Sequence, residues 1–357
     1  MHLLMRHWPT VAPFVAWAVL GILWSWTVSP VVSGLALVLA VLAAVHHAEV
    51  IAHKVGEPFG TLILALAVTI IEVGLIVSLM SGAGEAAATL ARDTVIAAVM
   101  IILNGLIGIC LLIGALKHRE QSFQHTGVAA TLATLTALTV LSLVLPNYTV
   151  SEAGPVYSPE QLAFVAVVSL ILYGTFVTVQ TVRHRDYFLP PRHLAVDEDA
   201  HAEAPSGRAA LASAVLLLVT LGAVVLLAKE LSDPVEAAVA SLGAPRAIVG
   251  VIIAALVLLP EGVAATRAAL ANRVQTSLNL ALGSALATIG LTIPAVAVLS
   301  IIQDLPIALG LGAKGTALLL LSLLVTTQSL ATGRTTILQG MVHLVIFGVY
   351  LFTTVVP

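Results

Sequence analysis

The chain has 357 residues, of which 59% are hydrophobic and only 9% charged, and its mean hydropathy is +1.08. Because soluble domains carry about 25% charged residues, this composition excludes an ordinary soluble domain and indicates that hydrocarbon is the main solvent. The formal net charge of -3 offers no basic surface for nucleic acid, and the single cysteine, Cys110, excludes a disulfide framework or a cysteine metal cluster.

Apolar segments of about 20 residues, each long enough to span a bilayer, recur along the whole chain. The first is predicted to be a retained helix and not a cleaved signal peptide, because further spans follow it and no small-residue cleavage motif is obvious. The predicted spans are residues 10–28, 30–49, 60–81, 94–116, 126–146, 160–182, 209–229, 245–267, 276–301, 315–331 and 334–355. We predict an all-α polytopic membrane protein with about eleven transmembrane helices, or ten if the short tenth segment does not span.

Basic residues are distributed unequally over the loops that join these spans. With eleven spans, one side of the membrane receives eleven of the 15 Lys and Arg residues and the other receives four. Cytoplasmic loops carry the excess of Lys and Arg in membrane proteins. We therefore expect a multi-pass protein of the inner (plasma) membrane, with the N-terminus in the cytoplasm and the C-terminus outside.

The longest hydrophilic stretch, residues 183–208, separates the sixth span from the seventh. It contains three arginines, five acidic residues and three histidines between Arg183 and Glu203. One reading is a solvated cytoplasmic linker. The other is a cation or pH sensor, since carboxylates with histidines can bind a divalent ion or titrate near neutrality.

An internal repeat lies on either side of this linker. Residues 49–58 and 236–245 both read Glu, six residues, Gly, any residue, Pro, and each precedes a span with one glutamate deep inside it. Those glutamates are Glu72, 14 residues after the first proline, and Glu261, 16 after the second. Five spans separate the two elements, an odd number, so the repeats are predicted to be inverted, which is typical of secondary transporters. The predicted organisation is an extra N-terminal helix (1–29), a first five-helix repeat (30–182), the linker (183–208) and a second repeat (209–357).

Glu72 and Glu261 are the strongest candidates for ion chemistry. Each lies about twelve residues into its span, or roughly 18 Å, near the bilayer centre. An ionised carboxylate at that depth is costly unless it is paired, hydrated or protonated. A proton and a cation then compete for the same carboxyl group, and competition with alternating access gives an antiporter.

Other oxygen-bearing residues could support a hard cation near these acids. Thr69 shares a helix face with Glu72, and Pro260, placed mid-helix, is expected to bend its span and free a carbonyl. Asn104, Asn279 and Ser284 lie within other spans, where they can be supporting ligands or serve helix packing.

Glu49 and Glu236 stand at the ends of predicted spans. They are either boundary residues or acids that draw cations toward the inner site from each side of the membrane. We expect no resident cofactor: the ligands are the transported cation (Ca²⁺, Na⁺ or K⁺) and the proton, and the surroundings are the lipid bilayer, with no nucleic acid partner.

These motifs resemble those of the calcium/cation antiporter superfamily, in its cation/proton exchanger branch, and most closely its bacterial sodium-potassium/calcium–proton antiporters. The resemblance covers nearly the whole chain and rests on residues 56–73, 258–262, 279–288 and 332–335. It implies an eleven-span fold of two five-span inverted repeats with an extra first helix, and Glu72 and Glu261 as the ion and proton carriers. The chain lacks the Gly-Asn pair that vacuolar-type calcium/proton exchangers carry before each acid, which puts strict calcium selectivity in doubt.

The sequence thus predicts a secondary active antiporter that exchanges a cation for protons, and not an enzyme. The principal alternative is a cation channel or an uncoupled permeation pathway, whose acids would line a continuous pore. An intramembrane enzyme such as a diacidic protease is disfavoured by the inverted repeat and by the lack of a protease-like context around the acids.

Overall fold

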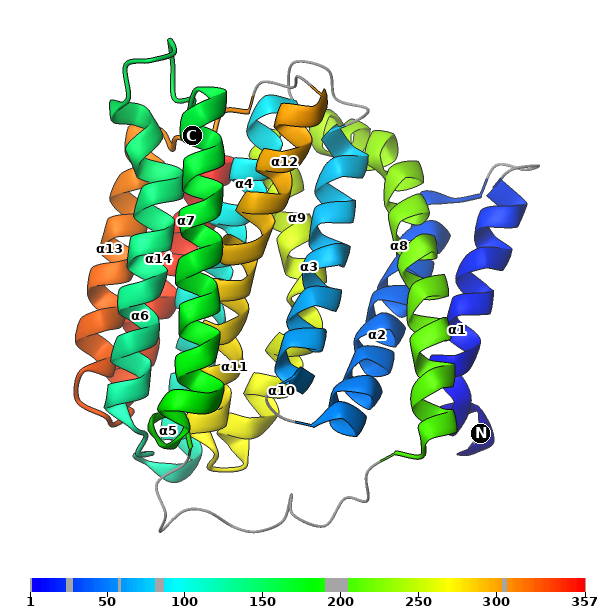
Figure 1. The fold of residues 1–357 in the computed structure, drawn as a ribbon, viewed down its shortest axis with the longest axis horizontal. Coiled ribbons are helices and arrows are strands. Elements are labelled where there is room, and N and C mark those ends of the chain that lie inside the picture. Colours follow the sequence, from blue (N-terminus) through cyan, green and yellow to red (C-terminus); the bar gives the residue numbers. More distant parts are fainter. Residues whose placement is uncertain are drawn as a thin grey trace. The chain divides into compact units, whose positions relative to one another are not determined.

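The described residues of the chain form helices and no β-strand (Figure 1). The computed structural model describes residues 2–23, 28–56, 59–80, 87–189, 205–303 and 307–356. The all-α prediction is confirmed. A single isolated bridge, between Ser122 and Arg334, is the extended pairing that these residues contain.

Fourteen α-helices follow one another along the described chain. They are α1 (His2–Leu23), α2 (Pro30–Val55), α3 (Phe59–Met80), α4 (Ala87–Met100), α5 (Ile107–His118), α6 (His125–Thr139), α7 (Pro159–Thr178), α8 (Gly207–Ser241), α9 (Ala247–Val257), α10 (Leu259–Leu270), α11 (Val274–Ala287), α12 (Ile293–Gln303), α13 (Ala313–Leu330) and α14 (Ile337–Val355).

Short π-helical segments continue or join several of these helices. Segment η2 (Ile101–Leu106) joins α4 to α5, and η9 (Thr288–Thr292) joins α11 to α12. Segments η3 (Val140–Val144) and η5 (Val179–Arg183) extend α6 and α7. A π-helical turn is often found at a functional site. Segments η2 and η9 interrupt apolar helices midway and are therefore candidate positions for residues that bind a ligand.

The helices are long and apolar enough for a multi-pass membrane protein. Among the described residues, eight helical runs meet this criterion, or up to nine if α9 and α10, bent by 56°, count as one span. Helices α1 and α3 occupy the places of the two other predicted spans. The chain is therefore a multi-pass membrane protein, and the count of eleven spans stays a prediction.

The chain forms two compact units, and neither coincides with one predicted repeat. Unit 1 comprises residues 1–87 and 198–249 and thus contains α1, α2, α3 and α8. Unit 2 comprises residues 88–197 and 250–357 and contains the remaining helices, with α9 from Gly250 onward. Each unit combines helices from both halves of the sequence, while the division at the linker stays a prediction.

Unit 1 is a helical cluster organised around α2. Helix α2 packs extensively against α8 and also contacts α1 and α3, while α8 contacts both α1 and α3. In unit 2 the main contacts are those of α14 with α5, α10 with α11, α12 with α7, α10 with α5 and α11 with α6. Alanine-rich faces permit this packing, as Ala40, Ala43 and Ala44 of α2 are completely buried.

Both glycines of the predicted repeat end a helix in the backbone conformation that favours glycine. Gly56 follows α2 with a φ of 76°, and Gly243 closes the turn after α8 with a φ of 66°. A residue with a Cβ would be strained at either position. The shared Gly therefore has the same local role at both places, which supports the repeat; residues 57 and 58 of the first element lie outside the described residues.

Helix α8 is longer than the span predicted for it. The predicted span ends at Lys229, but the helix continues to Ser241 and includes Pro234. Its 35 residues amount to about 52 Å, well beyond the roughly 30 Å hydrocarbon thickness. Glu236 consequently lies within the last two turns of a helix and not at the edge of a loop.

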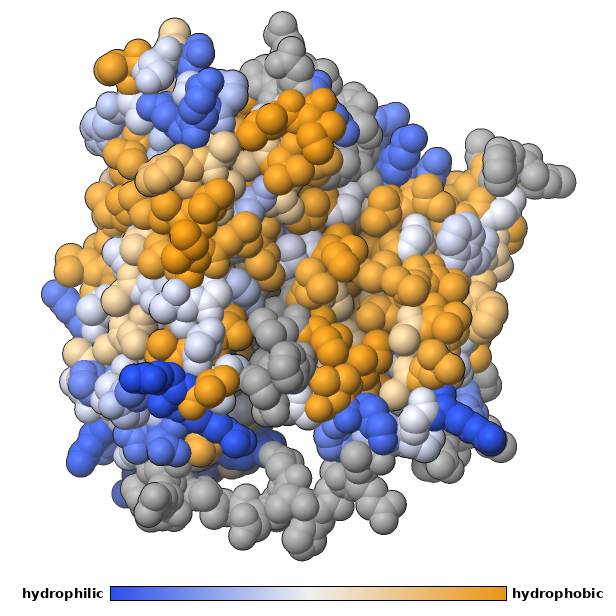
Figure 2. Space-filling model, viewed as in Figure 1, coloured by the Kyte–Doolittle hydropathy of each residue, from blue (hydrophilic) through white to orange (hydrophobic). Residues whose placement is uncertain are grey.

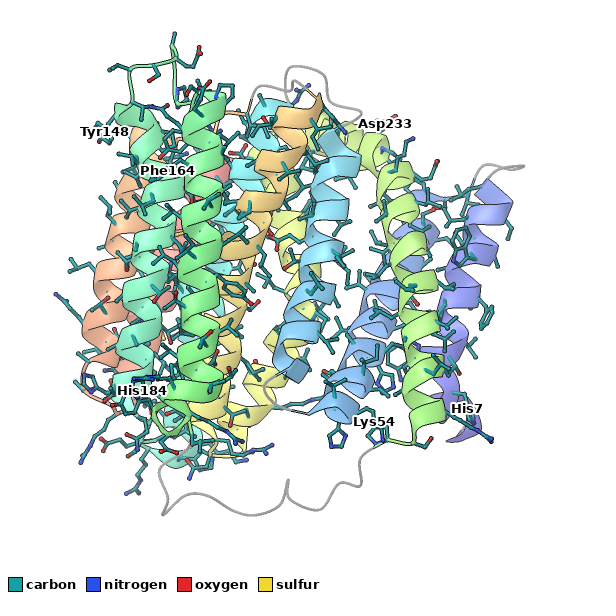
Figure 3. The ribbon with its side chains drawn as sticks, in the orientation of Figure 1. His7, Lys54, Tyr148, Phe164, His184 and Asp233 are labelled. Atoms are coloured by element: carbon teal, nitrogen blue, oxygen red, sulfur yellow. The ribbon has the colours of Figure 1, made fainter. Side chains whose placement is uncertain are left out.

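Hydrophobic residues cover the sides of the helices, and hydrophilic residues gather toward their ends (Figure 2). On α7 the exposed Phe164 and on α8 the exposed Leu218 are examples of side chains suited to lipid. Within unit 1, His7 and Lys54 lie at one end of the helices and Asp233 at the other; within unit 2, Tyr148 and His184 lie at opposite ends (Figure 3).

The beginning of the linker is fixed to unit 2. A short helix η6 (Arg185–Tyr187) follows α7, with His184 stacked on Tyr187 at 4.9 Å between ring centroids. Gly127 of α6 has no room for a Cβ beside the Tyr187 carbonyl. Most of the predicted sensor residues, from 190 to 204, lie outside the described residues, so that hypothesis stays a prediction.

Candidate functional site

Glu72 is buried inside α3 in unit 1. Glu72 is only 2% exposed, and Thr69, one helical turn earlier on the same face, is 6% exposed. Ile71, Leu75 and Ile76 on this helix are also buried. The carboxyl group and the threonine hydroxyl are thus the polar elements of an apolar stretch, as the sequence predicted.

A close helix contact lies two residues beyond Glu72. A Cβ on Gly74 would stand 2.6 Å from Cγ2 of Val225 in α8, which is too short for any real contact. Glycine therefore allows α3 to approach α8 closely at the level of the acid. This contact holds the helix that carries Glu72 against the middle of α8, within the same unit.

Glu261 lies at a helix break in unit 2. Helix α9 ends at Val257, α10 begins at Leu259, and their axes differ by 56°. The predicted bend is confirmed, but Pro260 occupies the first turn of a new helix and not the middle of a continuous one. Proline suits this place because it lacks the N–H that the first turn cannot satisfy.

The break gives Glu261 a particular electrostatic setting. Glu261 is half-buried and lies in the first turn of α10, where backbone N–H groups are left without helical acceptors. The partial positive charge of a helix N-terminus favours a carboxylate there. The two glutamates therefore differ, since Glu72 stands within one continuous helix and Glu261 at the start of a half-helix.

Asn104 is completely buried in the π-helical segment η2. Its amide nitrogen Nδ2 donates to the Ser322 hydroxyl of α13 at 2.8 Å, and that hydroxyl donates to the Leu318 carbonyl at 2.7 Å. Among the described atoms, the amide oxygen Oδ1 has no hydrogen-bond partner. This pairing orients the side chain so that its acceptor oxygen remains available for a cation.

Glu261 and Asn104 belong to elements of unit 2 that pack together. Helix α10 contacts η2, and a Cβ on Gly262 would lie 3.9 Å from Leu106 of that segment. The turn that carries Glu261 therefore adjoins the segment that carries Asn104. Ser284 is half-buried in α11, four residues before η9 begins at Thr288, itself only 3% exposed.

Asn279 is engaged elsewhere. Its Oδ1 accepts from Gln275 at 3.0 Å, and its Nδ2 donates to the Phe188 carbonyl at 2.6 Å. Because both ends of the amide are used, the packing alternative describes Asn279 better than a ligand role. It anchors the segment after α7 to α11.

The two acids near span ends have different surroundings. Glu49 is exposed on α2, six residues before that helix ends, whereas Glu236 is half-buried in the last turns of α8. Both belong to unit 1 and to helices that contact each other. An exposed carboxylate on α2 suits the attraction of cations, while Glu236 suits it less.

Sequence reasoning did not identify Ser322. It lies in α13, is completely buried, and contacts Asn104 across 218 residues of sequence. Ser and Thr are common in this helix, as in Thr326 and Thr327, whose hydroxyls bond carbonyls of their own helix. No local pattern distinguishes Ser322 from them, so only the tertiary contact reveals its role.

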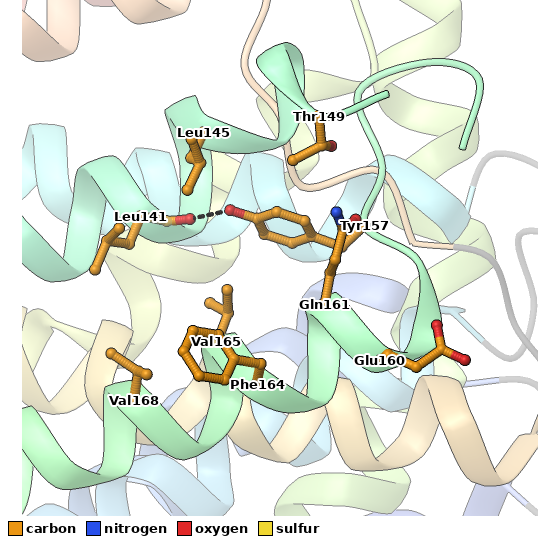
Figure 4. Close-up of a pocket in the computed structure, with 9 residues that line it drawn as sticks. All are labelled: Leu141, Leu145, Thr149, Tyr157, Glu160, Gln161, Phe164, Val165 and Val168. Carbon is orange, nitrogen blue, oxygen red and sulfur yellow. Dashed lines mark hydrogen bonds between the residues drawn. The ribbon is translucent and has the colours of Figure 1, made fainter. Parts of the chain in front are cut away.

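The described residues contain no cluster of three or more His, Cys, Asp or Glu side chains that could hold a metal ion together. A cavity of about 320 Å³ does lie between α7 and the segment that begins with η3, and it is lined mainly by apolar side chains such as Leu145, Phe164 and Val168 (Figure 4). None of the predicted site residues lines it. Its surface suits a hydrocarbon chain and not a hard cation.

A family model now identifies the group to which this fold and these residues belong. The model of the sodium/calcium exchanger protein family matches residues 25–182 and 212–356. The chain belongs to this family. The matched residues contain both glutamates and lie on either side of the linker.

Two bacterial proteins are similar to this chain over most of its length. The chain is 52% identical over 318 residues to y4hA of Sinorhizobium fredii, which is named for ionic transport, covering 89% of this chain and 86% of that protein. It is 37% identical over 357 residues to the sodium-potassium/proton antiporter ChaA of Escherichia coli, covering 98% and 96%.

The fold is similar to that of a solved exchanger. The crystal structure of the H⁺/Ca²⁺ exchanger CAX superposes with a TM-score of 0.72 at 17% identity, over 96% of this chain and 87% of that one. Identity this low shows a common fold alone. The shared fold agrees with the all-α architecture described above.

Proposed function

We propose that this member of the sodium/calcium exchanger protein family is a secondary active antiporter that exchanges a cation for protons, with Glu72 and Glu261 as shared carriers. The observation that carries the proposal is the burial of Glu72, 2% exposed within the apolar helix α3, which occupies the place of a predicted span. An ionised carboxylate at such a place is costly unless it is paired, hydrated or protonated, so an acid there is a candidate for ion transport.

Burial leads directly to coupling. In a site with little water, the charged form of a carboxyl group is costly, so the proton leaves when a cation takes its place. The proton and the cation therefore occupy the site in turn. If the site opens alternately to the two sides of the membrane, each cycle exchanges one for the other.

The half-helix at Glu261 supplies the second carrier. Its carboxylate lies at the start of α10, and Asn104 on the adjoining η2 offers an unused amide oxygen. Oxygen ligands of this kind suit Na⁺, K⁺ and Ca²⁺. We assign Asn104 as a supporting ligand, with Thr69 in the same role beside Glu72 and Ser284 as a candidate near η9.

The relatives support cation–proton exchange and a choice among three cations. ChaA is named a sodium-potassium/proton antiporter and CAX an H⁺/Ca²⁺ exchanger. We infer that the cargo is Na⁺ or K⁺, Ca²⁺, or more than one of them. The distribution of basic residues supports an N-terminus in the cytoplasm and a C-terminus outside.

Transport in everted membrane vesicles tests the proposal. A pH gradient is imposed, and Na⁺, K⁺ and Ca²⁺ are added separately while the gradient is followed with a fluorescent amine. At least one cation is expected to dissipate the gradient. Glu72→Gln and Glu261→Gln, which keep size but cannot ionise, are each expected to abolish that response.

Glu152→Gln is the matched control, because this exposed acid lies in the segment between α6 and α7 and should leave exchange unchanged. Exchange at the parent rate by either carrier variant would overturn the assignment of that glutamate. Cation currents that persist without movement of protons would instead support an uncoupled channel.

A further inference from the structure

His47 stands where three helices of unit 1 meet. It belongs to α2, is 2% exposed, and contacts α1 through the Pro9 carbonyl and α8 through the Ser213 hydroxyl. The distances are 3.0 Å from Nε2 to the Pro9 oxygen and 3.3 Å from Nδ1 to the Ser213 oxygen. One side chain thus joins the extra first helix to both helices of the α2–α8 pair.

The chemistry of α1 explains the first contact. Helix α1 contains two prolines four residues apart, Pro9 and Pro13. Pro13 has no N–H, so the Pro9 carbonyl lacks the donor that would ordinarily come from the residue four positions later. His47 supplies a donor to this buried carbonyl in its place.

The same contact fixes the tautomer of the ring. A carbonyl oxygen can only accept, so the proton of the neutral imidazole is on Nε2, and Nδ1 is left to accept from Ser213. Both ring nitrogens therefore have neutral partners. A second hydrogen bond, from Trp17 Nε1 to the Val219 carbonyl at 3.0 Å, also holds α1 to α8.

We propose that His47 is a positioning residue for exchange: as a neutral ring it pins α1 to α2 and α8, and when protons from the cytoplasmic side charge it, α1 is released. Both partners of the ring are uncharged, so a buried imidazolium would have no counter-charge in these contacts. Release of α1 would give the charged ring access to water, and protonation therefore favours the released state.

The charges around this junction do not offset that cost. On α2, Glu49 is two residues further along, which places it on the opposite side of the helix, and it is exposed. His46 is half-buried, and its ring centroid lies 6.2 Å from that of Trp8 and 5.7 Å from that of His47, edge-on. A charged His46 would add to the cost of charging His47 and not offset it. Among the side chains that the structure describes, the other titratable groups near this end are His7 of α1, His53 and Lys54 of α2 and Arg208 of α8. Of the elements packed against α2, α3 also carries Glu72, and α8 carries Lys229, Glu230, Asp233 and Glu236 toward its opposite end.

The consequence for transport rests on the proposed function. Helices α2 and α8 begin the two predicted repeats, and α3, which carries Glu72, contacts both of them. A clamp across α2 and α8 that responds to protons would tie the exchange rate to cytoplasmic pH through a group outside the carriers. His47 lies about 12 Å from the cytoplasmic end of α2 in the predicted orientation.

A distance measurement tests the release of α1 without requiring transport. Spin labels are attached to Phe14→Cys on α1 and Leu218→Cys on α8, both exposed, in a Cys110→Ala background and in lipid vesicles. Distances are measured at about pH 8 and pH 5.5, on either side of the ordinary histidine pKa of about 6.5. We expect the distances to lengthen or broaden at the lower pH.

His47→Gln keeps an N–H donor but cannot be protonated in this range, and its distances should not depend on pH. His46→Gln, the neighbouring histidine, is the matched control and should retain the parent response. Ser213→Ala leaves His47 in place but removes the partner of Nδ1, so release should extend to higher pH. It also tests the proposal if His47→Gln does not fold.

The same variants are then assayed for exchange over a range of cytoplasmic pH. Loss of the acid-side pH dependence in His47→Gln, with retention in His46→Gln, is the expected result. A parent distance that does not change with pH, or an equal change in His47→Gln, would overturn the proposal. If the distances respond as expected but Glu72→Gln and Glu261→Gln still exchange, the assignment of carriers fails alone.

Discussion

The hydrogen bond between Asn104 and Ser322 makes a measurable contribution to cation affinity if Asn104 is a ligand. Ser322→Ala removes the acceptor that holds Nδ2, so the amide of Asn104 is free to turn and present Nδ2 where Oδ1 would otherwise stand. A cation binds the oxygen and is repelled by the amide nitrogen. The substitution therefore reduces the fraction of molecules that are ready to bind.

The magnitude follows from the two orientations. If they become equally populated, half of the molecules are competent and the apparent affinity falls about twofold. Complete loss of one buried hydrogen bond, worth about 1 kcal/mol, corresponds to about fivefold. We therefore expect a two- to fivefold higher KM for the cation with little change in the maximal rate.

The assay is cation-dependent dissipation of a pH gradient in proteoliposomes, with KM measured for the parent, Asn104→Ala, Ser322→Ala and the double variant. Thr326→Val is the matched control, because this buried hydroxyl, one turn further along α13, bonds to the Ser322 carbonyl within its own helix. An unchanged KM in Ser322→Ala, or additive effects in the double variant, would refute the reasoning.

Two further predictions concern stability. A Cβ at Gly340 of α14 would lie 2.6 Å from the Leu112 backbone nitrogen, so Gly340→Ala should lower the free energy of unfolding by about 1–3 kcal/mol. Gly348→Ala on the same helix has no described atom within 4 Å of the new Cβ and should raise it by up to about 1 kcal/mol. Thermal unfolding in detergent distinguishes the two variants, and equal melting temperatures would contradict the packing. Burial raises the pKa of Tyr157, whose hydroxyl donates to the Leu141 carbonyl, to about 12, so the stability that the neutral tyrosine provides is present below pH ~10 and lost between about pH 10 and 12. Tyr157→Phe should therefore show a smaller loss of melting temperature over that range than the parent, and an identical loss would contradict it.

Much of the fold was predictable because hydrocarbon imposes a simple rule on sequence. Each predicted apolar segment of about 20 residues corresponds to a helix or a pair of joined helices, and the bend near Pro260 was expected from its missing N–H. The repeated glycines at 56 and 243 were also informative, since a helix that ends in a positive φ favours glycine.

The remaining features depend on contacts that sequence does not show. Helix α8 extends twelve residues beyond the span predicted to end at Lys229, because a charged residue near a membrane surface can continue a helix into water. Pro260 was predicted in the middle of a helix but lies in the first turn of α10. Proline can begin a helix as well as interrupt one, and the sequence does not show which. Ser322 gave no local signal at all, and its pairing with Asn104 required two distant helices to be placed side by side.

The composition of unit 1 has a consequence for biogenesis. Its principal helix contact joins α2 to α8, but α8 begins at Gly207, after three intervening spans of unit 2 have left the ribosome. The first three helices must therefore remain in the bilayer, inserted but incompletely packed, until the second half of the chain is synthesised. During that interval the acid of α3 and the polar junction on α2 lack their final neighbours, so membrane chaperones and quality-control proteases would meet the nascent chain at this stage.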